Sequence, residues 1–288
     1  MSFLALNNFK ASLLKEITYQ ITRLVLVPLA ILLLISSNFS TEIILLGIII
    51  ALSLSFLSAL ILLLILSKKN LSFLKTKKSN LSKKETKALF AFTLPLSVTV
   101  LSGMFFGYID ILILGKFVES EFIGFYQAAF SLATSGAALL SFASSSMFPI
   151  FVRLTGQRLV RGFKKALRAM IVVSLLGGLF TYLVAPFAIR IIFGPEYLSA
   201  TPLLRIFSLI VFLLPLVGIY STYYISNKKT LSNSIILLSA TAINIILNFV
   251  FIIYLIPRGM IYAVGGVCVS TVISKFAHLF GLMVFRKK

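Results

Sequence analysis

The sequence predicts an all-α, polytopic integral membrane protein with eight transmembrane helices and both termini in the cytoplasm. Hydrophobic residues make up 59% of the chain and charged residues only 12%, whereas soluble domains average about 25% charged residues. The mean hydropathy is +1.08. This composition excludes a soluble globular domain. The net charge of +20 does not indicate nucleic-acid binding, because no aromatic platform or recognition module accompanies the basic residues.

Eight apolar runs are each long enough to cross a bilayer, which requires roughly 20 helical residues. We expect spans at 21–38, 43–66, 88–115, 122–151, 169–192, 199–225, 231–255 and 260–284. Ahead of them, residues 1–23 carry apolar positions at helical spacing. We expect that segment to be a helix that lies at the interface or leads into the membrane. A signal peptide is the alternative, but no small-residue cleavage site follows.

Two basic connectors divide the chain. Residues 68–87 contain eight lysines and one glutamate, which predicts a cytoplasmic linker between two structural units. The expected domains are therefore residues 1–67, the linker 68–87 and a six-helix unit at 88–288. The second basic connector covers residues 153–168 and leads to the fifth span.

The charge distribution fixes the expected orientation. Of the 27 Lys and Arg residues, 22 fall on segments that lie on one side if eight spans alternate. The five exceptions are Lys116, Arg190, Arg205, Arg258 and Lys275. Because cytoplasmic segments are enriched in Lys and Arg, this side is predicted to be the cytoplasm. The basic connectors orient the helices, and specific binding of anionic head groups is the alternative.

Three ionisable residues lie inside spans, where they are costly and are read as functional. Asp110 and Arg205 each lie roughly 8–10 Å below the outer end of a span. We expect them to face one another, either as a structural ion pair or as an ion-coupling carboxylate beside a substrate-binding cation. Lys275 lies too deep to snorkel easily and is expected to face a water-filled groove and bind substrate. The alternative is a hydrogen bond from Lys275 to a neighbouring carbonyl or to Ser274.

Other polar residues allow weaker inferences. The single cysteine, Cys268, excludes a disulfide within the chain, and together with the single histidine, His278, it disfavours a metal site of thiolate and imidazole ligands. Asn244 and Asn248 are expected to hydrogen-bond across helices. The tyrosines at 108, 126, 182 and 197 suit anchoring at the membrane interface. The spacing of Gly103 and Gly107 indicates helix packing at most.

The order of several motifs resembles the polysaccharide flippases of the multidrug/oligosaccharidyl-lipid/polysaccharide exporter superfamily. The segments that carry the resemblance include FTLPLSVTV, YIDILILGKF, MFPIFVRL and IRIIFGPEYLSATPLLRIFSLI. Its matching residues are Pro95, Asp110, Gly194, Glu196, Tyr197, Gly259, Gly265 and Gly266. Pro195 is inserted into the glycine–glutamate–tyrosine turn of the family.

The resemblance implies a partial two-lobe exporter fold, with spans one and two as the last helices of an incomplete first lobe. The chain is then a fragment, half of a split transporter or a degenerate copy, and a second chain could supply the missing helices. The expected function is movement of lipid-linked oligosaccharide or polysaccharide precursors across the cell membrane. The expected partners are membrane lipids and this substrate, and no nucleic acid.

Two other classes of function stay open. A multidrug or cation exporter of the same superfamily would require acidic cavity residues, and a non-transporting structural remnant would require none. A membrane glycosyltransferase is disfavoured, because such catalysis needs a carboxylate base or metal ligands near a soluble face. We therefore expect no enzyme activity, no catalytic residues, no metal site and no cofactor.

Overall fold

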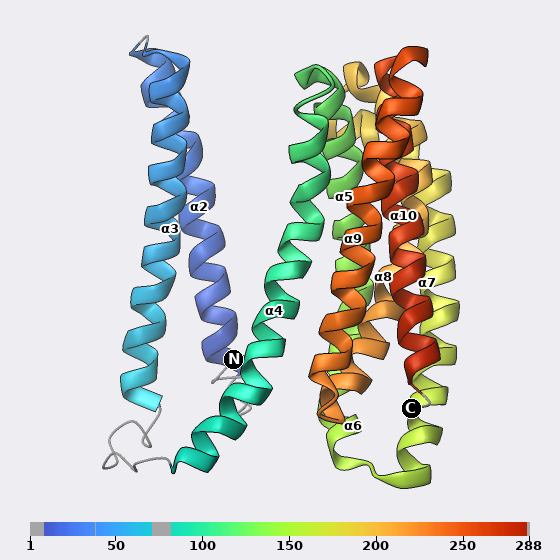
Figure 1. Ribbon diagram of the computed structural model, residues 1–288. Coiled ribbons are helices and arrows are strands. Elements are labelled where there is room, and N and C mark those ends of the chain that lie inside the picture. The colour runs from blue at the N-terminus through green and yellow to red at the C-terminus, as the bar shows by residue number, and fades with distance from the viewer. Residues whose placement is uncertain (1–8, 38, 71–81, 287–288) are drawn as a thin grey trace. The chain divides into compact units, whose positions relative to one another are not determined.

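The computed structural model describes residues 9–37, 39–70 and 82–286 and is helical throughout its regular elements (Figure 1). The chain divides into two compact units, residues 1–80 and 81–288. Each unit is described by itself below.

Eight helical segments of the described chain are long and apolar enough to cross a membrane, as the sequence predicts. They are Leu13–Ser36, Thr41–Leu66, Lys83–Leu114, Ser120–Arg153, Gly156–Phe193, Pro195–Ser226, Thr230–Arg258 and Met260–Phe285. The fold class is thus confirmed as an all-α, multi-pass membrane protein. The cytoplasmic location of the termini stays a prediction.

Unit 1 is a pair of packed helices, α2 (Phe9–Ser36) and α3 (Thr41–Asn70). The hydroxyl oxygens of Thr22 and Ser58 lie 3.2 Å apart between them. The sequence predicts an amphipathic segment over 1–23 followed by a span at 21–38. The structure joins them in one helix that continues through Pro28, and residues 1–8 lie outside the described part of the chain.

Within residues 82–286, unit 2 holds six long helices and three short helical pieces. Their order is α4 (Lys83–Leu114), α5 (Ser120–Ser146), α6 (Phe148–Arg153), α7 (Gly156–Phe193), η2 (Pro195–Ala200), α8 (Thr201–Ser226), α9 (Thr230–Leu255), η3 (Ile256–Arg258) and α10 (Met260–Phe285). Helix α8 is central, because it packs against α5, α7 and α10. Helix α4 packs mainly against α9, which in turn packs against α10 (Figure 1).

Small residues allow α5 and α8 to approach closely. Ala129, Ala133 and Ala137 recur every four residues along α5 and are completely buried. Small side chains at such spacing bring helix backbones together in membranes. The Ser144 hydroxyl donates a hydrogen bond to the Pro215 carbonyl of α8 over 2.8 Å, so a polar contact adds to the packing.

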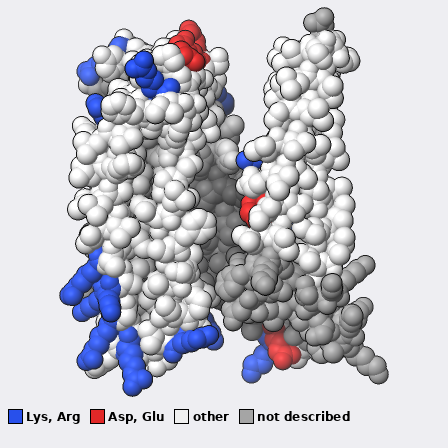
Figure 2. Space-filling view, turned by 180° about the vertical axis from the view of Figure 1, so that it is seen from behind, with Lys and Arg blue, Asp and Glu red and all other residues white. Residues whose placement is uncertain are grey.

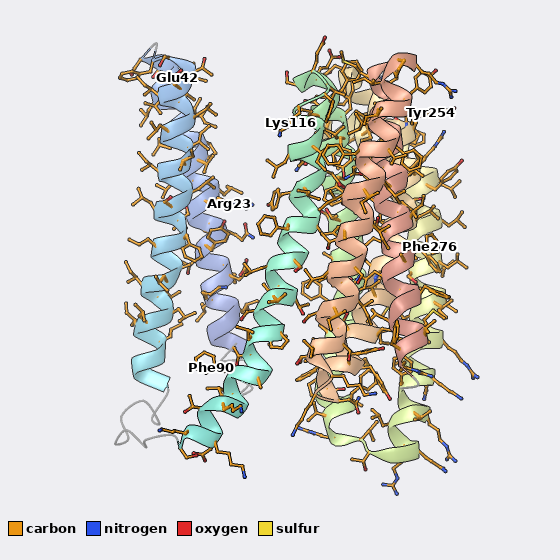
Figure 3. All side chains as sticks on the ribbon, in the orientation of Figure 1. Arg23, Glu42, Phe90, Lys116, Tyr254 and Phe276 are labelled. Carbon is orange, nitrogen blue, oxygen red and sulfur yellow. The ribbon has the colours of Figure 1, made fainter. Side chains whose placement is uncertain are left out.

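The outer surface of unit 2 is apolar, as expected for helices in lipid. Tyr254 and Phe276, labelled in Figure 3, are 65% and 46% exposed. Lys116 lies just beyond the end of α4 and is also exposed (Figure 3). The charged residue Asp110, by contrast, is completely buried. Unit 2 therefore places apolar groups outside and encloses its one aspartate.

The second basic connector, predicted for 153–168, is mostly helical. Helix α7 begins at Gly156 and includes most of it. Leu159, Phe163 and Met170 share one face and are buried, while the intervening Lys and Arg residues are exposed. An amphipathic pattern of this kind forms a helix when its apolar face finds a partner, so most of this connector is part of α7.

Two further boundaries differ from the sequence prediction. The fourth span, expected over 122–151, is broken at Met147 into α5 and α6, because Pro149 has no backbone N–H to continue the helix. Helix α3 continues to Asn70 and α4 begins at Lys83, so both helices extend into the range 68–87 expected as a linker, of which residues 71–81 lie outside the described part of the chain. Ser82 and Glu85 form a capping box there, which starts α4 before the apolar run.

We predict that Gly266→Ala lowers the thermal stability of the detergent-solubilised chain. A Cβ atom at Gly266 would lie 2.7 Å from Leu255 Cδ1 and 2.9 Å from Phe251 Cβ, so α9 and α10 would have to separate. Overpacking of this kind costs about 1–3 kcal/mol. Thermal unfolding followed by circular dichroism measures the change.

The matched control is Gly103→Ala, because nothing lies within 4 Å of a Cβ atom at that position. It should leave the melting temperature unchanged or raise it, since alanine favours helix over glycine by about 1 kcal/mol. Equal melting temperatures for the two variants would contradict the close approach of α9 and α10.

Candidate functional site

Asp110 is the centre of a buried hydrogen-bond cluster in unit 2. Its Oδ2 atom accepts hydrogen bonds from the Tyr126 hydroxyl and the Thr271 hydroxyl, both over 2.6 Å. Its Oδ1 atom accepts a hydrogen bond from Asn248 Nδ2 over 2.5 Å. All four residues are completely buried. The donors come from α5, α10 and α9, so the carboxyl group connects α4 to three other helices.

Asn244 extends the cluster. Its Oδ1 atom lies 3.5 Å from Asn248 Nδ2, and its Nδ2 atom lies 3.5 Å from the Thr271 hydroxyl. The Ser270 hydroxyl donates a hydrogen bond to the Asn244 backbone carbonyl over 3.1 Å. The expectation that the two asparagines bond across helices is confirmed. A buried carboxyl group needs such partners, because burying an unpaired one is costly.

Thr271 gives the cluster two ways to share protons. Its hydroxyl lies 2.6 Å from Asp110 Oδ2 and 2.9 Å from the Val267 carbonyl oxygen. A hydroxyl has only one proton to donate. When it donates to Asp110, the carboxylate can be charged. When it donates to Val267, the short contact with Asp110 requires a proton on the carboxyl group. The geometry therefore accommodates both protonation states.

One atom of the cluster has no donor. Asn248 Oδ1 is buried and has no hydrogen-bond partner among the described residues. Buried polar atoms are nearly always satisfied. This oxygen therefore stands as an available acceptor on a residue that already contacts Asp110.

The predicted pairing of Asp110 with Arg205 is wrong. Within the described ranges the only ion pair joins Lys15 and Glu16 at 3.1 Å. Leu204 and Phe207 point into the core of unit 2, which turns Arg205 to the exposed face of α8. Its guanidinium lies 5.3 Å from the ring centroid of Tyr182 on α7. Equal depth along two helices thus did not bring the charges together.

Lys275 lies in a groove of about 370 Å³ between α4, α5, α8 and α10. The lining residues are Gly103, Phe106, Gly107, Tyr108, Gln127, Phe130, Ser131, Thr134, Ile210, Leu214, Thr271 and Lys275. The Lys275 Nζ atom lies 3.2 Å from the centroid of the Phe106 ring. An ammonium over an aromatic face is stabilised by the ring quadrupole. Among the described residues Lys275 forms no hydrogen bond to Ser274, the alternative partner, whose own hydroxyl donates to the Ser270 carbonyl.

Gly103 and Gly107 keep this groove open. No atom lies within 4 Å of a Cβ atom at either position, and both residues line the groove. The sequence predicts a packing role for their spacing, whereas the structure leaves space beside them. Larger side chains at these positions would fill the groove.

Thr271 belongs to both the cluster and the groove. It bonds Asp110 and also lines the groove, one helical turn from Lys275 on α10. A change at Asp110 can therefore reach the groove wall through a single side chain. His278, one turn beyond Lys275, is 4% exposed, and its ring nitrogens have no partner within the described part of the chain.

The sequence reasoning missed Tyr126 and Thr271. Tyr126 is predicted to anchor at the interface, but it is buried and bonds Asp110. Thr271 lies among other small polar residues in the eighth span, and nothing in the sequence distinguishes it from them. Among the described residues, no group of three or more His, Cys, Asp or Glu side chains could hold a metal ion.

Comparison with known proteins provides two matches. Residues 2–155 match the family described as "Polysaccharide biosynthesis protein". An uncharacterized membrane protein of Methanocaldococcus jannaschii is 24% identical over 210 residues, which cover 69% of this chain and 39% of the relative. The chain therefore spans about two fifths of the length of that relative. No solved structure matches.

We predict that Asp110 is energetically coupled to Thr271 and not to Arg205. In a double-mutant cycle, Asp110→Asn and Thr271→Val should show an interaction energy of about 0.5–3 kcal/mol, because the side chains share a hydrogen bond. Chemical unfolding of the purified chain measures each term.

The comparison cycle combines Asp110→Asn with Arg205→Gln. Its two effects should add within about 0.3–0.5 kcal/mol, as for sites that do not share partners. Strong coupling in this second cycle would mean that the two charges do meet.

Proposed function

Because the chain belongs to the polysaccharide biosynthesis protein family, we propose that it takes part in moving lipid-linked oligosaccharide or polysaccharide precursors across the cell membrane. The observation that carries this proposal is the groove around Lys275 and its connection to Asp110 through Thr271. Moving such a precursor changes the side on which its head group lies and makes or breaks no covalent bond. We therefore assign binding and coupling roles and no catalytic ones.

The groove provides the chemistry that a sugar pyrophosphate requires. Lys275 supplies a positive charge for phosphate oxygens. Gln127, Ser131 and Thr134 supply donors and acceptors for sugar hydroxyls, and the Phe106 and Phe130 rings supply apolar faces. A volume of about 370 Å³ lies at the lower end of the range for small-molecule sites. It would hold the head of the precursor and not a long glycan.

The substrate role is assigned to Lys275 and not to Arg205. The sequence offers Arg205 as a substrate-binding cation, but Arg205 is not among the residues that line the groove. Its position over Tyr182 on the exposed surface is that of a side chain that directs its charge toward the nearer interface. We propose no contact between Arg205 and the substrate.

The nature of the groove also bears on the rival exporter function. A site for cationic drugs requires carboxylates, and none of the residues that line the groove is acidic. Lys275 would repel a cationic substrate. We therefore favour an anionic head group over a cationic one.

We further propose that Asp110 couples this movement to a cation gradient. One buried carboxylate compensates one positive charge, which suits a proton or a monovalent cation better than a divalent metal. Asp110 and the unpartnered Asn248 Oδ1 offer the oxygen atoms that hard cations bind. Binding there changes how Thr271 can donate, and Thr271 also lines the groove.

We predict that Lys275→Ala weakens binding of a polyprenyl-pyrophosphoryl oligosaccharide about tenfold or more. A hydrogen bond to a charged group contributes about 1.5–3 kcal/mol, and 1.4 kcal/mol corresponds to a factor of ten. Equilibrium binding of a fluorescent analogue to the purified chain, followed by a flipping assay in liposomes, measures the effect.

Two control variants accompany this test. Lys275→Arg should recover part of the affinity, and Lys116→Ala at the end of α4 should leave it unchanged. Wild-type affinity in Lys275→Ala would refute the substrate role of the groove. Failure of the unaltered chain to bind the analogue at all would instead support a structural remnant.

A separate prediction concerns coupling. Asp110→Asn should abolish any acceleration of flipping by an imposed Na⁺ or H⁺ gradient. The neutral amide can neither take up a proton nor compensate the charge of a bound Na⁺ ion. The rate without a gradient and the substrate affinity should change much less. Flipping rates with and without each gradient identify the ion, and Glu121→Gln serves as a surface control.

A gradient response that survives in Asp110→Asn would show that the coupling group lies elsewhere. A response that is absent in the unaltered chain as well would remove the coupling proposal but not the binding one.

A further inference from the structure

A second pocket, of about 670 Å³, lies where the first turns of α7 meet the end of α8. Arg161 and Lys164 of α7 line it together with Gln157, Tyr223 and Asn227. It shares no lining residue with the groove around Lys275. Two cations, two side-chain amides and a phenol therefore face one cavity that the proposed transport function does not use.

Within the described residues, the cations of this pocket have no protein counterion. From residue 153 onward, the only carboxylate side chain of the sequence is Glu196. It follows the C-terminal end of α7, whereas Arg161 and Lys164 lie near the N-terminal end, about 45 Å away along the helix. The Glu85 carboxylate of α4 accepts a hydrogen bond from the backbone N–H of Ser82, within the capping box of that helix. Within the described residues neither Arg161 nor Lys164 forms an ion pair.

Other Lys and Arg residues surround the pocket and add to its positive potential. They gather along the end of unit 2 to which the first turns of α7 belong (Figure 2). Exposed residues of this group are Arg153, Arg158, Lys165, Arg168 and Lys228. A single-sign cluster of this size attracts anions and is not neutralised within the described chain.

An aromatic cluster packs against Tyr223, one of the residues that line the pocket. The Tyr223 ring lies 4.7 Å from that of Phe163 and 6.3 Å from that of Phe151. The Arg286 guanidinium lies 4.6 Å from the Phe163 centroid and 5.9 Å from that of Tyr223. The cluster thus positions the Tyr223 ring and places a third cation, Arg286, beside it.

The length of α7 places the pocket at head-group level. A helix of 38 residues is about 57 Å long, whereas the hydrocarbon core is only about 30 Å thick. All the α7 residues of the pocket fall within positions 156–164. Val160, which also lines the pocket, is 40% exposed and offers an apolar contact for an acyl chain.

We propose that this pocket binds the phosphate-bearing head group of an anionic membrane lipid. Arg161 and Lys164 contact the phosphate oxygens, and Gln157 and Asn227 bond the polar part of the head group. Basic pockets between transmembrane helices on the cytoplasmic side bind such head groups. A bound lipid joins the start of α7 to the end of α8, the central helix of unit 2.

Thermal unfolding of the purified full chain in neutral detergent tests this proposal. Short-chain phosphatidylglycerol should raise the melting temperature by about 2–4 °C. Phosphatidylcholine of the same chain length should raise it much less. Because the contact is electrostatic and partly exposed, the difference should shrink as salt increases.

The decisive variant is Arg161→Gln with Lys164→Gln, which should lose the shift caused by phosphatidylglycerol. Its matched control is Arg158→Gln with Lys165→Gln, which removes the same charge from the same turns of α7. Neither of these two residues lines the pocket. The control should keep the shift. If the double variant melts too early to be read, the single variants Arg161→Gln and Lys164→Gln should each lose part of the shift.

Three results would overturn the proposal. Equal loss in the test and control pairs would mean general attraction to the basic surface and no pocket. An equal shift with phosphatidylcholine would remove the requirement for an anionic lipid. An equal shift with inorganic phosphate would assign the pocket to a soluble anion. Lys275→Ala should retain the shift, which separates this pocket from the proposed transport groove.

Discussion

The hydrogen bonds around Asp110 are the interaction on which the arrangement of unit 2 depends. A carboxyl group inside an apolar bundle has to find its donors within the protein, because lipid offers none. Tyr126, Asn248 and Thr271 provide them from three different helices. The positions of α4, α5, α9 and α10 are therefore specified by one side chain as well as by apolar packing, which is less directional.

The hydrogen bonds of Asp110 and the close contacts between helices hold different parts of the bundle together. The interface of α5 with α8 relies on buried alanines and one serine-to-carbonyl bond. The interface of α9 with α10 depends on Gly266, which has neighbours too near for a side chain. Between α4 and α8 the helices instead leave the groove of Lys275. The packed helices thus leave an open groove whose wall includes Thr271, a member of the polar cluster.

Hydropathy predicted the eight spans because a membrane requires long apolar helices whatever their neighbours are. It also placed Asp110 and Lys275 inside those spans. Hydropathy does not show which way each helix is rotated about its axis, and therefore which neighbour a side chain faces. The similar depths of Asp110 and Arg205 consequently suggested an ion pair that the structure does not form. Residue type misled the interpretation of Tyr126, whose phenol bonds Asp110. The helical spacing of Leu159 and Phe163 could have predicted the early start of α7.

The open space beside Gly103 and Gly107 has an evolutionary consequence. Most residues inside a packed bundle change only together with their neighbours, since each cavity or clash costs stability. These two positions carry no such constraint, because nothing lies within 4 Å of an added Cβ atom. Single substitutions at Gly103 or Gly107 can narrow the groove while the contacts between the surrounding helices are kept. Under the proposed function, selection on the size of the substrate head group can therefore act at these two positions without a change elsewhere in the fold.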